Sequence, residues 1–273
     1  MPAVFFGHGS PLNALQRNRY TMAWQQFGKA TPRPHSILCI SAHWYTRGTS
    51  VTSMAKPKTI HDFGGFPQAL YEVEYPAPGD PSLASRVIEL LADIQVAADA
   101  SGWGLDHGTW SVLKHVYPQA DIPVVQLSID GSQPLAYHYE LAKSLAPLRD
   151  EGVLVVGSGN VVHNLRVMRA EGAGPYPWAE RFNAGVYSRL IAHDHAGLAN
   201  MAALGEDGSM SIPTPEHYLP LLYVIALQQA GDSLQFLADG VEMGSISMMS
   251  IALGAGLQNY SGTASRGGQI QDD

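Results

Sequence analysis

Histidine is the residue type whose placement in this sequence points most clearly to chemistry, and the chain of 273 residues contains 11 of them. Three histidines follow short apolar runs of the kind that form buried strands. They are His8 after Val4–Phe6, His43 after Ser36–Ile40, and His163 after Val153–Val156 and a glycine-rich turn. Because the carboxyl ends of parallel strands meet at one edge of a sheet, these imidazoles are expected to converge there. Converging imidazoles are typical of a site for a divalent transition metal.

A fourth histidine, His217, lies in the proline-rich segment Pro213–Pro220. Pro215 is suited to the first turn of a helix, but Pro220 lacks the backbone N–H that a second helical turn needs. We therefore expect a turn at His217 and a regular helix from about Leu219. A backbone braced by prolines would hold one metal ligand rigidly, so His217 joins the candidates.

The remaining histidines carry a weaker signal. A single histidine near a strand end is more often a surface or structural residue than a ligand, and the H-E-x-x-H spacing of many zinc enzymes does not occur. His61 and His107 each lie beside an aspartate and close to glycine, as in loops that contact a substrate. A competing interpretation is that these aspartates cap backbone N–H groups in turns. The carboxylates of Asp62, Glu72 and Glu74 are interpreted as solvated loop charges.

Other function classes are disfavoured by composition and by missing motifs. Lys and Arg number 16 against 24 Asp and Glu, the net charge is −8, and no basic run occurs, so we expect no nucleic-acid partner. The single cysteine, Cys39, excludes an internal disulfide framework and a cysteine-based zinc cluster. Neither a G-x-S-x-G elbow around Gly157–Asn160 nor a G-x-G-x-x-G fingerprint is present, and Ser10 beside His8 does not match a hydrolase pattern. Without a long apolar stretch or a signal-peptide pattern, we expect no membrane association and a cytoplasmic protein.

Strands and helices alternate along the chain, and this order predicts how the histidines are positioned. We expect strands at Val4–Phe6, Ser36–Ile40, Ile122–Ile129, Val153–Val156 and Val241–Leu253, and helices at Tyr20–Lys29, Asp80–Leu91, Thr109–Val116, Leu135–Leu148, Glu180–Ile191 and Leu219–Gln229. Single helices between strands favour an α/β fold with a mostly parallel central sheet flanked by helices. Hydrophobic residues make up 45% of the chain, which is enough for a large core. We predict one domain over residues 1–260 and a polar tail over residues 261–273.

Six segments together resemble one enzyme family. They are GHGSP (Gly7–Pro11), SAHW (Ser41–Trp44), TIHDFGGFPQALYEVEYPAPG (Thr59–Gly79), DHGTWSVL (Asp106–Leu113), GSGNVVHNL (Gly157–Leu165) and PTPEHYLPLLY (Pro213–Tyr223). In this order they are similar to the DOPA-type branch of the class III extradiol ring-cleavage dioxygenases, the LigB-like family, over nearly the whole chain. The resemblance implies a single three-layer α/β/α domain with one divalent metal.

The resemblance also implies a role for each candidate histidine. His8, His43 and His217 match the metal ligands. His163 matches the acid/base histidine beside the metal, which some homologues count among the ligands, and His107 matches a position in the substrate pocket. Many class III enzymes use two histidines and a carboxylate, whereas the third position here falls on His217. Because three neutral imidazoles suit zinc as well as iron, Fe(II) is expected for activity and Zn(II) is expected to bind in purified protein.

The activity that the resemblance implies is insertion of O₂ into a catechol ring next to the two hydroxyls, with DOPA or a related phenolic as substrate. The residue types fit, because three protein ligands leave positions free for a diol and O₂, and a histidine carries a proton near neutral pH. Two alternatives stay open: a zinc hydrolase that uses the same histidines, and a non-catalytic metal-binding protein. A monomer and a dimer are both compatible with the chain's size.

Overall fold

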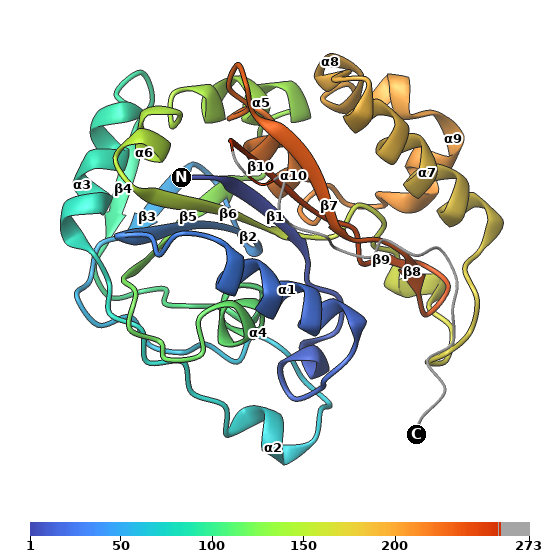
Figure 1. The fold of residues 1–273 in the computed structure, drawn as a ribbon, viewed down its shortest axis with the longest axis horizontal. Helices are drawn as coiled ribbons and strands as arrows, with labels where there is room; N and C mark the ends of the chain where they lie inside the picture. Colours follow the sequence, from blue (N-terminus) through green and yellow to red (C-terminus); the bar gives the residue numbers. More distant parts are fainter. Residues whose placement is uncertain (256, 258–273) are drawn as a thin grey trace.

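A sheet of eight strands forms the centre of the fold, which a computed structural model describes for residues 1–255 and 257 (Figure 1). In spatial order the strands are β4 (Val96–Asp99), β3 (Thr49–Thr52), β5 (Val124–Asp130), β2 (Ser36–Thr46), β6 (Val153–Gly159), β1 (Ala3–Gly7), β10 (Ser250–Gly254) and β7 (Ser233–Ala238). The four central strands β5, β2, β6 and β1 run parallel. β10 and β7 extend the sheet in antiparallel pairing, and β3 pairs antiparallel with β5. The predicted mostly parallel sheet is thus confirmed.

Helices cover both faces of this sheet. They are α1 (Arg19–Ala30), α2 (Gln68–Tyr71), α3 (Pro81–Leu90), α4 (His107–Val116), α5 (Leu135–Lys143), α6 (Pro147–Asp150), α7 (Pro177–Ile191), α8 (His195–Leu198), α9 (Gly205–Ser211) and α10 (Leu219–Ile225), with the 3₁₀ turns η1 (Pro11–Ala14), η2 (Leu165–Val167) and η3 (Met201–Leu204). In Figure 1, α1 and α4 lie on one side of the sheet, and α5 and α7 on the other. The predicted three-layer arrangement is therefore confirmed.

Alternation along the strands explains why the molecule has two apolar cores. In β1, Ala3 and Phe5 belong to one core, and Val4 and Phe6 to the other, because successive side chains of a strand point to opposite faces. The first core also contains side chains of α3, α5, α7 and α10, and the second contains those of α1 and α4. A central strand buried on both faces must be apolar throughout, which is why β1 was recognisable in the sequence.

The strand predicted to end at Ile40 continues as β2 to Thr46. His43 therefore lies within a strand, which corrects the prediction that it follows one. The pairing of β2 with β5 changes register between Ile40 and Tyr45. Beyond Ile40 the strand is held by its neighbours in the sheet, since its own sequence is a mixture of polar and aromatic residues.

The segment Val241–Leu253 does not form the single strand that its apolar residues predict. It divides into β8 (Val241–Glu242), β9 (Ile246–Ser247) and β10, and the first two pair as a separate small sheet. Gly244 has a φ of 77°, a left-handed conformation that favours glycine, and it reverses the chain between them. The edge strand β7 is only half-buried over much of its length and is absent from the sequence prediction.

The helices predicted at Leu135–Leu148 and Leu219–Gln229 are shorter than expected. The first is interrupted between Lys143 and Pro147, which begins α6; a proline cannot donate the hydrogen bond that an unbroken helix would require there. The second ends as α10 at Ile225. These corrections leave the order of the main helices and strands unchanged.

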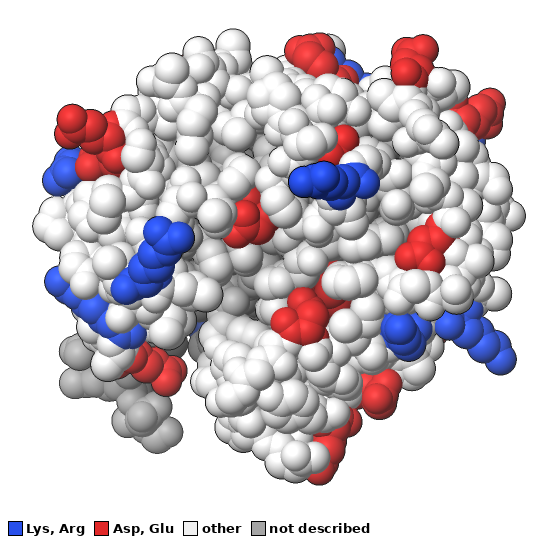
Figure 2. Space-filling model, turned by 180° about the vertical axis from the view of Figure 1, so that it is seen from behind, with Lys and Arg blue, Asp and Glu red and all other residues white. Residues whose placement is uncertain are grey.

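Other local predictions are confirmed. The carboxylate of Asp80 caps α3 by accepting hydrogen bonds from the backbone N–H groups of Ser82 and Leu83, at 3.1 and 3.0 Å, and Trp24 and Phe27 on α1 are buried. Figure 2 shows charged side chains of both signs scattered over one face of the molecule among larger uncharged areas. In the described part of the chain, no helix is long and apolar enough to cross a bilayer. The predicted tail, residues 261–273, lies outside the described residues.

Candidate metal centre

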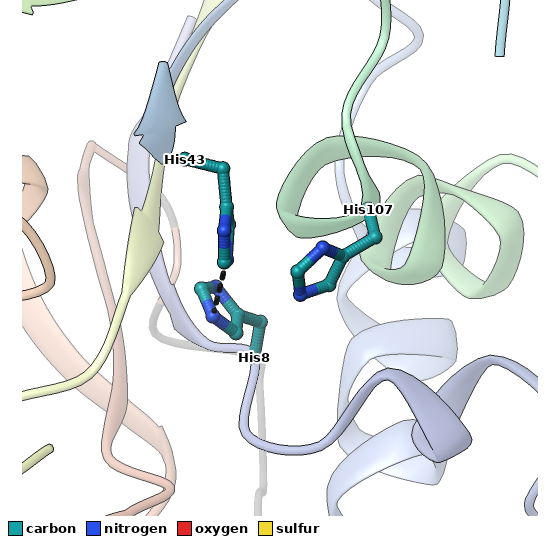
Figure 3. Close-up of side chains that lie close together, drawn as sticks. All are labelled: His8, His43 and His107. Carbon is teal, nitrogen blue, oxygen red and sulfur yellow. Dashed lines mark hydrogen bonds between the residues drawn. The ribbon is translucent and has the colours of Figure 1, made fainter. Parts of the chain in front are cut away.

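Five imidazoles meet beyond the carboxyl ends of the central parallel strands. Ring centroids are 5.1 Å apart for His8 and His43, 3.8 Å for His43 and His107, 5.4 Å for His8 and His217, and 3.4 Å for His163 and His217. His8 follows β1, His43 lies in β2 and His107 begins α4, and their rings are turned toward one another in Figure 3. The structure thus brings together His8, His43, His107, His163 and His217, whereas His61 contacts the carbonyl oxygen of Val73 instead, and the role of each one stays a prediction.

Backbone contacts at the end of β6 hold two of these segments side by side. The carbonyl oxygen of Gly159 accepts a hydrogen bond from the N–H of His8 at 3.0 Å, and the N–H of Asn160 donates to the carbonyl oxygen of His217 at 2.8 Å. Gly159 has no room for a side chain, because a Cβ atom there would overlap the carbonyl oxygen of His217. The glycine next to His217 in space thus allows the close approach.

The proton on His8 is positioned by a serine of the neighbouring strand β6. The hydroxyl of Ser158 donates to the carbonyl oxygen of Gly108 at 2.5 Å, and its oxygen lies 2.9 Å from Nδ1 of His8. Because the hydroxyl proton is already directed at Gly108, the serine oxygen accepts from Nδ1–H of His8. The lone pair of His8 is therefore on Nε2. Sequence analysis missed Ser158, whose only signal is its place in a glycine-rich turn.

His43 and His217 have the same tautomer for a different reason, since a carboxylate faces Nδ1 of each ring. Nδ1 of His43 lies 3.2 Å from Oδ2 of Asp62, and Nδ1 of His217 lies 3.2 Å from Oε1 of Glu216. An ionised carboxylate only accepts hydrogen bonds, so each Nδ1 carries the proton and each Nε2 has a free lone pair. All three histidines predicted as ligands therefore offer Nε2.

The Nε2 atoms of His8 and His43 are spaced as two ligands of one metal ion would be. Among the described residues, ligand atoms within 4.8 Å of one another form two groups, His8 with His43 and His107, and His163 with Glu216 and His217. Nε2 of His8 and Nε2 of His43 are 3.3 Å apart (Figure 3), and two tetrahedral ligands at about 2.0–2.1 Å from one ion are separated by about 3.3 Å. Nε2 of His217 is buried without a hydrogen-bond partner in the described structure. A buried polar atom without a partner costs free energy, and a bound cation would remove that cost.

Burial keeps the site histidines neutral. Loss of hydration, reinforced by neighbouring imidazoles, lowers the pKa of His8 and His217 well below the ordinary value and the pKa of His43 to about 3. Burial likewise lowers the pKa of His163 to about 4. Neutral imidazole is the form that binds a metal or accepts a proton, so both abilities are present near neutral pH.

His163 differs from the three predicted ligands. Its ring stacks on His217 with an angle of 7° between the planes, and among the described residues neither ring nitrogen has a hydrogen bond. Its backbone N–H donates to the carbonyl oxygen of Ser211 at 2.9 Å, which fixes the segment. One nitrogen of His163 also lies within 4.8 Å of ligand atoms of Glu216 and His217. This arrangement is compatible with an acid/base role and with ligation.

Asp62 lies in the histidine cluster, and its interpretation as a solvated loop charge was wrong. Its side chain is only 16% exposed, and it is part of the site instead of a solvated loop charge. Oδ1 accepts from the backbone N–H of His107 at 2.8 Å, and Oδ2 lies 2.9 Å from Nδ1 of His107. Burial opposes ionisation of Asp62, but hydrogen bonds from His107 and the nearby imidazoles outweigh it and lower the pKa. The neighbour in sequence, His61, turns away to the carbonyl oxygen of Val73 at 2.9 Å.

In the second His–Asp pair, Asp106 and His107, the aspartate caps a helix, as the competing interpretation predicted. Asp106 accepts from the backbone N–H of Thr109 at 3.0 Å and so begins α4. It is fully buried and also accepts from the side chains of Ser41 at 2.7 Å and Gln126 at 2.7 Å. The aspartate beside His107 in sequence therefore supports the helix, and the distant Asp62 serves His107.

One aromatic ring, that of Phe63, borders the site. It meets His107 edge-on, with centroids 5.4 Å apart, and it also contacts Phe66 at 5.4 Å. Both phenylalanines are partly exposed. Trp44 and Trp110 are buried core side chains. Of these four aromatic side chains, the loop phenylalanines are therefore the more exposed ones near the site.

A comparison with known proteins identifies the family. The family model described as the catalytic LigB subunit of aromatic ring-opening dioxygenase matches residues 13–254. The chain belongs to this family. The LigB family assignment confirms the resemblance in the six sequence segments and makes the protein an extradiol ring-cleavage dioxygenase.

Alignments with individual relatives cover most of this LigB family member. A 4,5-DOPA dioxygenase extradiol of Escherichia coli (strain K12) is 54% identical over 258 residues, which are 93% of this chain and 95% of the relative. One of Beta vulgaris is 37% identical over 238 residues, 84% and 87% of the two chains. The crystal structure of an uncharacterized protein from Escherichia coli K12 matches with a TM-score of 0.82 at 48% identity, covering 93% of this chain and 100% of that one. The fold is thus that of the family.

Proposed function

We propose that this LigB family member is a metal-dependent dioxygenase that inserts O₂ into the ring of a catechol, DOPA or a related phenolic, beside the diol. The observation that carries the proposal is the common tautomer of His8, His43 and His217, whose Nε2 lone pairs are free at one edge of the sheet. The names of the relatives support the choice of substrate. We further propose that the catalytic domain spans residues 1–260.

The metal is proposed to bind through Nε2 of these three histidines, with His163 as a possible fourth ligand. Bound Fe(II) would supply a centre through which electrons pass from the ring to O₂. Zinc suits the same nitrogens but does not change its oxidation state, so zinc-loaded protein is expected to be inactive in ring cleavage.

The other side chains of the site are proposed to bind the substrate and to transfer its proton. His163 is neutral and has unoccupied ring nitrogens, so it would accept the proton of a catechol hydroxyl and later return it. His107 would accept a hydrogen bond from a substrate hydroxyl at Nε2, because its Nδ1 faces Asp62. Phe63 would contact the ring of the substrate from the side of the loop.

Metal reconstitution tests the proposal. Metal-free protein would be loaded with Fe(II) without oxygen, and O₂ uptake would be followed with several catechols. One metal per chain, uptake of O₂ and a new yellow product are expected. Hydrolysis of an ester or amide by the zinc form, with no O₂ uptake by the iron form, would indicate the hydrolase alternative. Metal binding with neither activity would indicate a non-catalytic protein.

Single substitutions locate the metal. His8→Ala, His43→Ala and His217→Ala should each lose most of the metal, because removing one of three ligands leaves an incomplete site. His35→Ala is the matched control, since His35 is exposed and lies outside the cluster. Full metal content in all three variants would show that the metal is held elsewhere.

A further inference from the structure

One carboxylate contacts two histidines to which different roles have been assigned. Oδ2 of Asp62 lies 3.2 Å from Nδ1 of His43 and 2.9 Å from Nδ1 of His107, and Oδ1 accepts from the backbone N–H of His107 at 2.8 Å. His43 is a proposed metal ligand, and His107 is proposed to bind the substrate. Asp62 is therefore a carboxylate in contact with both functions.

The contacts determine where each ring carries its proton. With a carboxylate oxygen within 3.2 Å of each Nδ1, the protons of His43 and His107 are favoured on Nδ1, which leaves Nε2 for other partners. The two rings lie close, with centroids 3.8 Å apart, so rotation of one ring would disturb the other. Hydrogen bonds from outside the ligand set are known to orient metal-binding histidines in this way.

Asp62 also fixes the loop that carries it. The loop lies between β3 and α2, and the bond to the backbone N–H of His107 joins it to the first turn of α4. The next residue, Phe63, is thereby held with its ring edge-on to His107. The orientation of both histidines and the position of the aromatic ring thus depend on one side chain.

We propose that Asp62 is a positioning residue that orients His43 toward the metal and His107 toward the substrate. The inference rests on the proposed function, since it assumes a metal at Nε2 of His43. It assigns Asp62 a role in the site that does not involve contact with the metal or the substrate.

The substitution Asp62→Asn is the sharpest test because it keeps the shape of the side chain. Oδ1 accepts a hydrogen bond and Oδ2 lies within 3.2 Å of two ring nitrogens, so an amide must turn its NH₂ group toward at least one of these groups and lose that contact. The affinity of the full chain for Zn(II), measured by competition with a chelator, should fall about 10–100-fold. The kcat/KM of the Fe(II)-loaded enzyme for a catechol should fall at least about tenfold.

Matched variants separate positioning from a change in net charge. Glu74→Gln makes the same charge change at an exposed carboxylate close by in the sequence, and it should leave Zn(II) affinity and kcat/KM unchanged. Asp62→Glu keeps two accepting oxygens and should recover part of the loss. In a His107→Phe background, Asp62→Asn should still weaken Zn(II) binding through His43, whereas its effect on KM should disappear.

A measurement on the unmodified chain keeps the inference testable even where a variant does not fold. Two-dimensional NMR of the ¹⁵N-histidine-labelled, zinc-loaded protein reports which ring nitrogen carries the proton. Protons on Nδ1 of both His43 and His107 are expected, and a bare Nδ1 on either would overturn the inference.

The outcomes also distinguish this inference from the proposed function. If the wild-type chain binds no metal or shows no O₂ uptake with catechols, the proposed function fails and the inference fails with it. If the wild-type chain does both while Asp62→Asn keeps wild-type Zn(II) affinity and kinetics, only the role of Asp62 is wrong.

Discussion

At the scale of single residues, the three proposed ligands reach the same tautomer with different acceptors. A serine hydroxyl faces His8, a shared aspartate faces His43, and the adjacent Glu216 faces His217. The acceptors come from different segments of the chain, so no single local motif encodes the protonation pattern. The site is consequently prepared for metal by the fold as a whole.

Replacement of His163 by glutamine tests its assignment to proton transfer. His163→Gln should keep the metal, because three other imidazoles remain, and should lower kcat by roughly 10²–10⁴-fold, the usual effect of losing a positioned proton carrier. Metal content and steady-state rates of the Fe(II)-loaded variant would be measured together. A variant that no longer binds metal would place His163 among the ligands.

Acid sensitivity of the fold is predicted from His138, which lies outside the metal site. Its ring is fully buried on α5, with Nδ1 3.0 Å from the hydroxyl of Tyr223, and burial lowers the pKa to about 4 from the ordinary value of 6.5. The unfolded chain therefore takes up this proton more readily. The contribution of neutral His138 to stability is complete above pH 6.5 and is lost as the pH falls toward 4.

The loss should amount to about 2 kcal/mol between pH 7.5 and pH 5. Urea unfolding of metal-free protein at both pH values would measure it. The pH dependence should be smaller by about this amount in His138→Gln and unchanged in His35→Gln, which alters an exposed histidine. Equal pH dependence in the wild type and in His138→Gln would contradict the prediction.

At the scale of elements, the end of β6 sets the distance between two ligand-bearing segments. Gly159→Ala should push away the turn that carries His217, because the new methyl group would overlap its carbonyl oxygen. We expect Zn(II) affinity to fall by about tenfold or more and stability to fall by about 1–3 kcal/mol. Chelator competition and thermal unfolding would measure the two effects.

Gly185→Ala provides the control for this substitution. Gly185 is exposed on α7, and an added Cβ atom there would meet nothing within 4 Å. The change should raise stability by about 0.5–1 kcal/mol and leave metal binding unaltered. Normal metal affinity in Gly159→Ala would mean that the turn around His217 shifts to make room for the methyl group without moving the imidazole of His217.

Elements buried on both faces were predictable, and those shaped by their neighbours were not. The apolar runs in β1, β5 and β6 and the cap at Asp80 carry their own signals. The continuation of β2 to Thr46 depends on pairing with β5, and the half-exposed edge strand β7 lacks a continuous apolar run.

The same distinction holds in the site. Histidines that follow glycine-framed strand ends could be recognised, and the family resemblance assigned their roles. The contact of Asp62 with His43 and His107 depends on how a loop folds back onto α4, which no spacing in the sequence specifies. The apolar and aromatic neighbours of Asp62, Ile60 and Phe63, are the only local indication that this loop packs against the protein.

At the scale of the whole molecule, Arg149 joins Met1 to the segment between α10 and β7. Its buried guanidinium lies 2.6 Å from Asp232 and donates to the carbonyl oxygens of Met1 at 2.8 Å and Leu227 at 2.5 Å. Arg149→Met should cost about 3–5 kcal/mol, because it removes the guanidinium from the buried carboxylate of Asp232 and leaves it the hydrogen bond from the backbone N–H of Gln229.

The double variant Arg149→Met with Asp232→Leu tests that explanation. It removes both charges and should recover much of the lost stability, as measured by urea unfolding. Metal binding should be unchanged in the folded fraction of both variants, because Arg149 lies outside the histidine cluster. A single variant as stable as the wild type would show that the ion pair contributes little.

The position of β1 in the sheet has a consequence for how the protein is made. β1 is synthesised before the other strands of the sheet, yet it pairs with β6 and with β10, the last strand of the described chain. Such distant pairings slow folding, and until they form the apolar residues Val4–Phe6 stay uncovered. His8 and His217 likewise meet only after most of the chain has been synthesised. We therefore expect the nascent chain to depend on chaperones and to acquire its metal only after release.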